Sequence, residues 1–211
     1  MIPLIAIVVL AFNLFSTGPD EKDAYDVAKQ QVVEQYRTHV LSIYGKGTPT
    51  TIDTWYVKFY DPESAEKARV AVVQNGKVVR FHPAEGATPN DDSRSFDPSQ
   101  NKVGVKTALD SAAKYAKDNL IQYDATRVYL HRTEMGKAPV WYVELLQGTK
   151  SLGRVYTGPD GAFASYKTPE AAASETAEHR ATGVGQDVKN TFLGIGGDLE
   201  EFFTGERTVD R

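Results

Sequence analysis

The chain of 211 residues contains no cysteine, four histidines and two tryptophans. The absence of cysteine excludes disulfides, thiol catalysis and thiolate metal ligands, although it does not identify a redox compartment. No two histidines have the H-x-H, H-x-x-x-H or H-E-x-x-H spacing of a zinc site. We therefore expect no metal, no cofactor and no catalytic set, and we interpret four residues as structural or solvent-facing: His39, His82, His131 and His179.

The sequence also lacks a surplus of positive charge. Its formal net charge is -4, whereas a nucleic-acid partner favours a basic face. We therefore expect no nucleic acid among its partners.

Long hydrophobic runs are missing except at the N-terminus. Residues 2–15 form an apolar run with Asn13 as its one polar residue, shorter than the ~20 residues that span a bilayer as a helix. We predict that residues 1–18 are a signal peptide or an N-terminal anchor, so that the protein is exported and is periplasmic, secreted or anchored on the outer side of a membrane. Only this segment is expected to contact a membrane. No Lys or Arg precedes it and no A-x-A motif follows, and the alternative is a buried strand or helix of a cytosolic domain.

The two tryptophans mark an internal repeat. Trp55-Tyr56-Val57 returns as Trp141-Tyr142-Val143, and each copy is followed by a hairpin signal that ends in glycine, at Gly76 and Gly161. Apolar spacings of three and four predict a helix before each copy, over residues 24–44 and 105–121. Only the second copy has a clear extra strand between helix and tryptophan, over residues 126–133, so the first unit is predicted to be abbreviated.

A helix followed by consecutive antiparallel strands indicates an α+β fold. We predict two helix-plus-antiparallel-meander units, over residues 22–82 and 104–167, joined by a linker over residues 83–103. The linker is rich in Pro, Gly and polar residues, which predicts that it does not order itself. Four of its side chains offer oxygen ligands for calcium, although a solvated linker is the preferred interpretation: Asn90, Asp91, Asp92 and Asp97.

In each strand, the tryptophan and the next alternate residues are apolar and lie on the same face. This pattern favours a core position for both tryptophans over a binding role. The opposite sheet face is predicted to be half-exposed and rich in tyrosine, which suits an interaction surface because Tyr joins contact area to a polar tip. The alternatives are an ordinary solvated face and an interface between the two units. The candidate binding residues on this face are Tyr56, Lys58, Tyr60, Tyr129, His131, Tyr142 and Glu144.

The tail, residues 168–211, carries nine acidic and four basic residues. It contains a narrow, heptad-like apolar seam, which predicts an amphipathic C-terminal helix. Glycines at 194, 196 and 197 each cost a helix about 1 kcal/mol, so we expect the helix to form when something covers the seam, either a partner or the protein's own sheets. The seam is a second candidate binding site: Val188, Phe192, Ile195, Leu199 and Phe202.

The second unit resembles a PepSY domain. The resemblance is carried by an alanine-bearing helix, a strand over residues 127–131, the W-x-V strand at Trp141, the G-x-V strand at Gly153 and the turn at Asp160-Gly161. The first unit keeps Trp55, Val57 and the Asn-Gly turn. The resemblance implies a cystatin-like α+β roll. It also implies a role in binding and restraining peptidases, or as an extracytoplasmic interaction module, and it brings no catalytic residues.

We therefore expect a non-catalytic, extracytoplasmic binding or regulatory module rather than an enzyme. Its partner is expected to be a protein, such as a peptidase or another envelope protein that it restrains. The alternative is a small-ligand-binding protein that uses a cleft between helix and sheet.

Overall fold

The computed structural model describes residues 20–84, 90–132 and 137–172. The predicted N-terminal signal or anchor and the seam of the tail lie outside these residues. Within them, no helix has both the length and the apolar character needed to cross a membrane.

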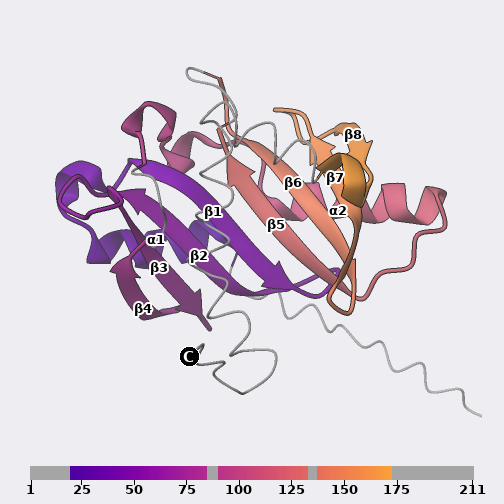
Figure 1. Cartoon of the computed structure of the whole chain (residues 1–211), viewed down its shortest axis with the longest axis horizontal. Coiled ribbons are helices and arrows are strands. Elements are labelled where there is room, and N and C mark those ends of the chain that lie inside the picture. Colours follow the sequence, from indigo (N-terminus) through magenta and orange to yellow (C-terminus); the bar gives the residue numbers. More distant parts are fainter. Residues whose placement is uncertain (1–19, 85–89, 133–136, 173–211) are drawn as a thin grey trace, which may run out of the picture.

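The fold is α+β, as predicted, and is built from two helices and one antiparallel sheet of eight strands (Figure 1). The first unit consists of α1 (Glu21–Ala28), β1 (Val40–Gly47), β2 (Ile52–Tyr60), β3 (Ala68–Gln74) and β4 (Lys77–Pro83). The second consists of α2 (Val105–Asp118), β5 (Ala125–His131), β6 (Val140–Gln147), β7 (Lys150–Thr157) and β8 (Phe163–Lys167). The strand order is β4-β3-β2-β1-β5-β6-β7-β8.

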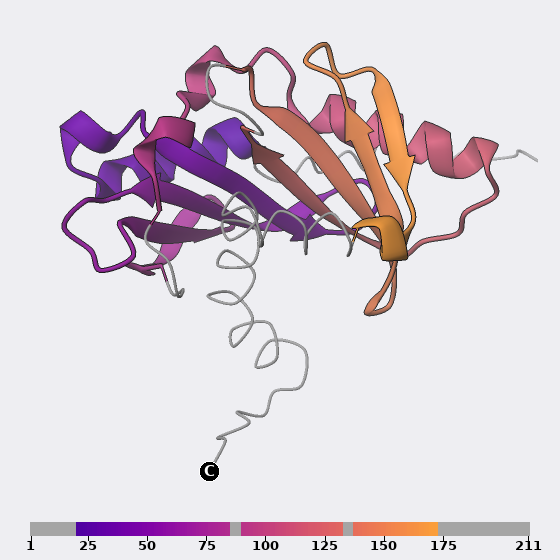
Figure 2. The ribbon, with the colours of Figure 1, turned by 45° about the horizontal axis from the view of Figure 1, so that its top comes forward.

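Both helices pack on the same face of the sheet, α1 against β2, β3 and β4, and α2 against β6, β7 and β8 (Figures 1 and 2). The main core lies between the helices and this face. Trp55 and Trp141 belong to it and are 0% and 1% exposed, so the prediction that they are core residues is confirmed.

The first unit is not abbreviated, and the helix predicted over residues 24–44 is wrong in its second half. The helix α1 ends at Ala28, two short 3-10 turns follow (Lys29–Gln31 and Glu34–Tyr36), and Val40 begins β1. The spacing of apolar residues in this stretch fits a helix. However, residues 40–47 form a strand, because β1 pairs with β2 on one side and with β5 on the other. These long-range pairings outweigh the local preference for a helix. Each unit therefore has one helix and four strands.

The two units share one sheet because β1 pairs with β5 in antiparallel register. Tyr44 lies opposite Tyr129, and Ile43 opposite Leu130. The sequence pattern predicts two separate meanders, and this continuous junction was not predicted.

The segment between the units is ordered over residues 90–103, contrary to the prediction for the linker. Phe96 is 3% exposed, and its backbone exchanges hydrogen bonds with Val40 at the start of β1. The indole Nε1 of Trp141 donates to the carbonyl oxygen of Val103 over 2.7 Å. The segment is thus tied to β1 of the first unit and to the core of the second.

The oxygen-bearing side chains of this segment have structural contacts. Asp91 and Asp97 cap two short 3-10 turns, Asp92–Arg94 and Pro98–Gln100, by accepting from backbone N–H groups. The amide of Asn90 donates to the carbonyl of Glu66, and Asp92 lies 2.8 Å from Nδ1 of His39.

The start of α2 depends on the first unit. Its N-cap residue, Gly104, has no side chain to accept a hydrogen bond. The carboxylate of Glu21 on α1 serves as the capping acceptor instead, and it accepts a hydrogen bond from the Val105 N–H. Burial raises the pKa of Glu21, and this hydrogen bond opposes the rise.

Replacing Trp141 with Phe should lower the free energy of unfolding by about 2–4 kcal/mol. The substitution leaves the buried Val103 carbonyl without its donor and leaves space where the larger ring was. Urea unfolding measures the change. The exposed residue Val79 provides the control, since Val79→Ala should change stability by less than about 0.5 kcal/mol. Equal effects of the two substitutions would contradict the proposed role of the indole.

Glu21→Gln should stabilise the protein more at pH 7 than at pH 4. The pKa of Glu21 is higher in the folded than in the unfolded state, so its stabilising contribution is present below the unfolded value of 4.5 and is lost as the pH rises through the folded value. Glutamine keeps an acceptor for the Val105 N–H but does not titrate. Melting temperatures of the two proteins at both pH values test this, and a difference that does not grow with pH would refute it.

Candidate functional site

A row of tyrosines crosses the sheet on the face opposite the helices. One tyrosine from each of five neighbouring strands lies beside the next in register. From β2 to β7 the residues are Tyr56, Tyr44, Tyr129, Tyr142 and Tyr156, which we call the tyrosine row.

The rings of the tyrosine row contact one another along its length. The centroids of Tyr44 and Tyr56 are 5.4 Å apart, and those of Tyr44 and Tyr129 are 6.0 Å apart across the junction between the units. The row continues from Tyr129 to Tyr142 at 5.1 Å and from Tyr142 to Tyr156 at 5.4 Å. Such aromatic pairs each add about 0.5–1.5 kcal/mol beyond the area that they bury, so the row is a continuous, stabilised surface.

A charged row runs parallel to the tyrosines, displaced from them by two residues on β1, β5, β6 and β7, and it ends on β8. It contains four basic residues and one acid, in the order Lys46, Arg127, Glu144, Arg154 and Lys167. Glu144 is 5% exposed, and its carboxylate lies 3.4 Å from Nη1 of Arg127 and 3.6 Å from Nε of Arg154. With one carboxylate among four bases, this part of the face is positively charged.

The basic side chains also lie over the tyrosine rings. The Lys46 ammonium is 5.7 Å from the ring centroid of Tyr56, and the Arg154 guanidinium is 5.1 Å from that of Tyr142. Lys167 lies 5.0 Å from the Tyr156 centroid. These are cation–π distances, and they join the tyrosine row and the charged row into one site, which we call the tyrosine face.

The candidate face residues predicted from the sequence are brought together, but they are less exposed than expected. The structure buries Tyr56, Lys58, Tyr129, Tyr142 and Glu144, whereas Tyr60 and His131 are partly exposed. The prediction of a half-exposed face is therefore wrong for most of these residues.

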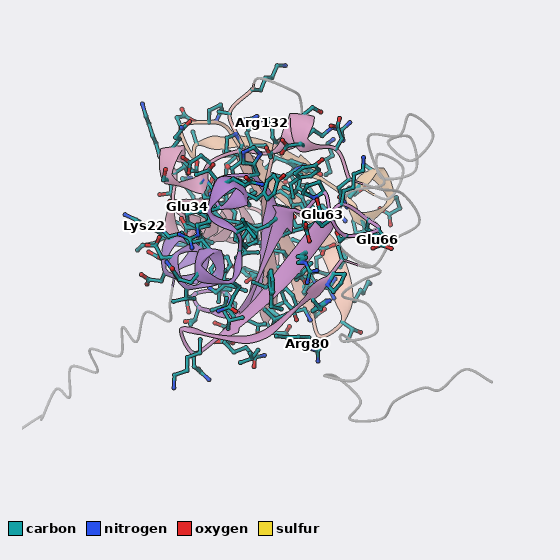
Figure 3. The ribbon with its side chains drawn as sticks, turned by 90° about the vertical axis from the view of Figure 1, so that its left-hand side faces the viewer. Lys22, Glu34, Glu63, Glu66, Arg80 and Arg132 are labelled. Carbon is teal, nitrogen blue, oxygen red and sulfur yellow. The ribbon has the colours of Figure 1, made fainter. Side chains whose placement is uncertain are left out.

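The described helices do not account for this burial, because α1 and α2 pack on the other face. A second apolar cluster surrounds the tyrosines and extends over β3, and it includes Leu41, Val70, Val72 and Ala84. Figure 3 shows the two sides of the sheet edge-on: Lys22 and Glu34 lie on the side of the helices, and Glu66 and Arg80 on the other side.

Burial changes the acid–base behaviour of the tyrosine row. It raises the pKa of Tyr142 and of Tyr44 well above the ordinary value of 10. Both phenols are therefore neutral at physiological pH. The Tyr142 hydroxyl is buried and has no hydrogen-bond partner among the described residues, which leaves a polar atom in the middle of the face for a bound group.

Two of the cavities in the described part of the chain are relevant to ligand binding. One of about 280 Å³ lies at the end of the central strands, beside the tyrosine face, and is lined by Lys46, Asp53, Tyr56, Asp124 and Arg127 among others. The other, of about 460 Å³, lies on the helix side between the start of α1 and residues 97–104, with Leu130 among its lining residues. Its charged lining consists of Asp20, Glu21, Lys22, Asp26, Lys29 and Asp97.

The structure places His131 beside tyrosine rings, 5.2 Å from Tyr129 and 5.8 Å from Tyr142, and not in either cavity. In the described part of the chain, no three His, Asp or Glu side chains are grouped as a metal site requires. The arrangement is suited to contact through aromatic rings and charge.

Tyr44, Tyr156 and the basic residues of the charged row were not predicted from the sequence. Tyr44 was assigned to a helix, so its place beside Tyr129 was not foreseen. Tyr156 had a usable signal, since it alternates with Val155 on a predicted strand, but only the register between strands shows that it continues the row.

Comparison of the chain with models of protein families, with curated proteins and with solved structures finds no match.

Replacing Tyr142 with Phe should leave stability at pH 7 unchanged or raise it slightly, since the buried hydroxyl has no partner among the described residues. It should also raise the pH of alkaline unfolding, because a phenol with a raised folded pKa loses its stabilising contribution as the pH rises. Tyr25→Phe is the matched control. The Tyr25 hydroxyl donates to the Arg37 carbonyl over 3.1 Å, and its removal should cost about 0.5–1.5 kcal/mol. A larger loss at Tyr142 than at Tyr25 would contradict the assignment.

Proposed function

We propose that this protein is a non-catalytic, extracytoplasmic binding or regulatory module that holds a protein partner on its tyrosine face. The observation that carries the proposal is the row of five tyrosines in ring contact across both units, with cations over three of the rings. Tyrosine and arginine are enriched where proteins bind one another, because they combine a large contact area with polar tips.

The chemistry of the face indicates the kind of partner. Four bases against one acid favour an acidic segment, and the apolar cluster over β1 and β3 favours one that also presents aliphatic or aromatic side chains. A peptidase or another envelope protein with such a segment is the partner that we propose. The PepSY-like pattern of the second unit supports this assignment, as does the matching helix and four strands of the first.

A second candidate function is the binding of a small ligand in the 460 Å³ cavity on the helix side. The volume is in the range of small-molecule sites, and four of its six charged lining residues are acids, which favours a cationic ligand. Ligand-dependent thermal shift, measured with polyamines as probes, separates this function from protein binding.

Reversing charge on the tyrosine face should weaken partner binding about tenfold, or roughly 1.4 kcal/mol. The test is the double variant Lys46→Glu and Lys167→Glu, which keeps all five tyrosines and the Glu144 ion pairs. A photo-crosslinking residue at Ser165, which lies opposite Tyr156 on the exposed strand β8, identifies proteins bound in an envelope extract.

The matched control is Lys106→Glu with Lys114→Glu, which makes the same charge change on exposed positions of α2. The control should crosslink like the unaltered protein. A partner lost equally from both variants, or retained by both, would refute the tyrosine face as its site.

A further inference from the structure

We infer that the tyrosine face is the docking site of the chain's own C-terminal segment, residues 183–204. This inference rests on the proposed function, because it takes the face to be a binding surface. It names the segment that occupies the face when no external partner is bound. Three properties of the face and of the segment support it: burial, charge and length.

The tyrosine face is buried although neither described helix covers it. Tyr129 and Tyr142 are 2% and 3% exposed, whereas α1 and α2 pack on the opposite face. Aromatic rings withdrawn from water favour an occupant that brings apolar surface to this face.

The tail has the charge that complements the face. It carries nine acidic and four basic residues, whereas the charged row has four bases and one acid. Glu200 and Glu201 stand beside the seam residues Leu199 and Phe202, so acids and apolar side chains would approach the face together.

The length of the apolar seam matches the width of the tyrosine row. Val188 and Phe202 are 14 residues apart, which is about 21 Å along a helix. Five neighbouring strands are four spacings wide, or about 19 Å. A helix that lies across the strands would thus set its five apolar side chains along the five tyrosines.

The chain is long enough to reach the face. The last residue that the structure describes is Ala172, just after β8, and Lys167 of β8 lies at one end of the charged row. The 16 residues from Ala172 to Val188 reach up to about 50 Å when extended. This reach exceeds the width of the eight-stranded sheet, which is about 34 Å.

A tethered segment on the binding face has a consequence for regulation. Because it acts at an effective concentration near the millimolar range, an acidic partner must displace it. The tail would then set the threshold for binding.

The experiment uses the full chain with one spin label. Because the sequence has no cysteine, Thr191→Cys labels one position and leaves all five seam residues intact. Paramagnetic broadening of amide signals should remove the signals of Tyr44, Tyr129 and Tyr142. It should spare Lys106 and Lys114 on the exposed side of α2.

The control adds Phe192→Asp and Leu199→Asp to the same labelled chain, which should restore the lost signals. A mixed sample shows whether the tail on the face belongs to the same chain or to a second copy. It combines isotope-labelled protein that has no spin label with spin-labelled protein that has no isotope label. Broadening in the mixed sample as well would mean that a second copy supplies the tail. This result would overturn the inference, as would equal broadening of both faces or of neither.

Partner capture distinguishes failure of this inference from failure of the proposed function. If both hold, the chain with Phe192→Asp and Leu199→Asp should capture its acidic partner about tenfold more strongly, because the tethered competitor is lost. Equal capture by both chains would overturn the inference and leave the proposed function standing. If neither chain captures a protein whose binding requires Lys46 and Lys167, the proposed function is overturned, whatever the spin label shows.

Discussion

The pairing of β1 with β5 is the constraint on which the rest of the structure depends. Without it, each unit would present the edge of its first strand to solvent, with a row of unpaired N–H and C=O groups. With it, eight strands form one sheet, and the alternation of side chains along each strand is in phase across both units. One face then receives both helices, and the other carries the tyrosine row without a break.

The two faces of this sheet are stabilised by different means. The helix side buries aliphatic side chains and the two tryptophans, where area removed from water is the main contribution. The tyrosine face depends on ring contacts, on cations held over rings, and on Glu144 between Arg127 and Arg154. Its polar atoms make it selective about what can cover it, since a purely apolar surface would leave those atoms without partners.

Local signals in the sequence predicted much of the fold. The Asn75-Gly76 turn formed as expected, with positive φ at both residues, and the phase of Trp55 and Trp141 placed both in the core. The failures came where distant partners decide the structure. Residues 40–44 fit a helix by spacing but became the central strand. Phe96 seemed to belong to an unordered linker but is buried against Val40.

The candidate site was predicted in part for the same reason. Tyr56, Tyr129 and Tyr142 could be assigned to one face, since the alternation along a strand is a local property. Whether they form a row depends on how neighbouring strands are aligned, and this in turn depends on bulges and hairpin lengths. The basic residues of the charged row gave no signal of their own, because each appears in the sequence as an ordinary solvated residue.

The register at the junction has the form of a two-fold symmetric dimer contact. Tyr44 and Tyr129 occupy matching places in the two units, opposite Tyr56 and Tyr142 respectively, and they also lie opposite each other. The flanking pairs, Gly45 with Val128 and Ile43 with Leu130, exchange roles about the same point. This is the pattern of an isologous interface, in which one patch meets its own copy. The chain thus carries within one polypeptide the geometry of a homodimer, and the pseudo-symmetry axis crosses the tyrosine row between Tyr44 and Tyr129.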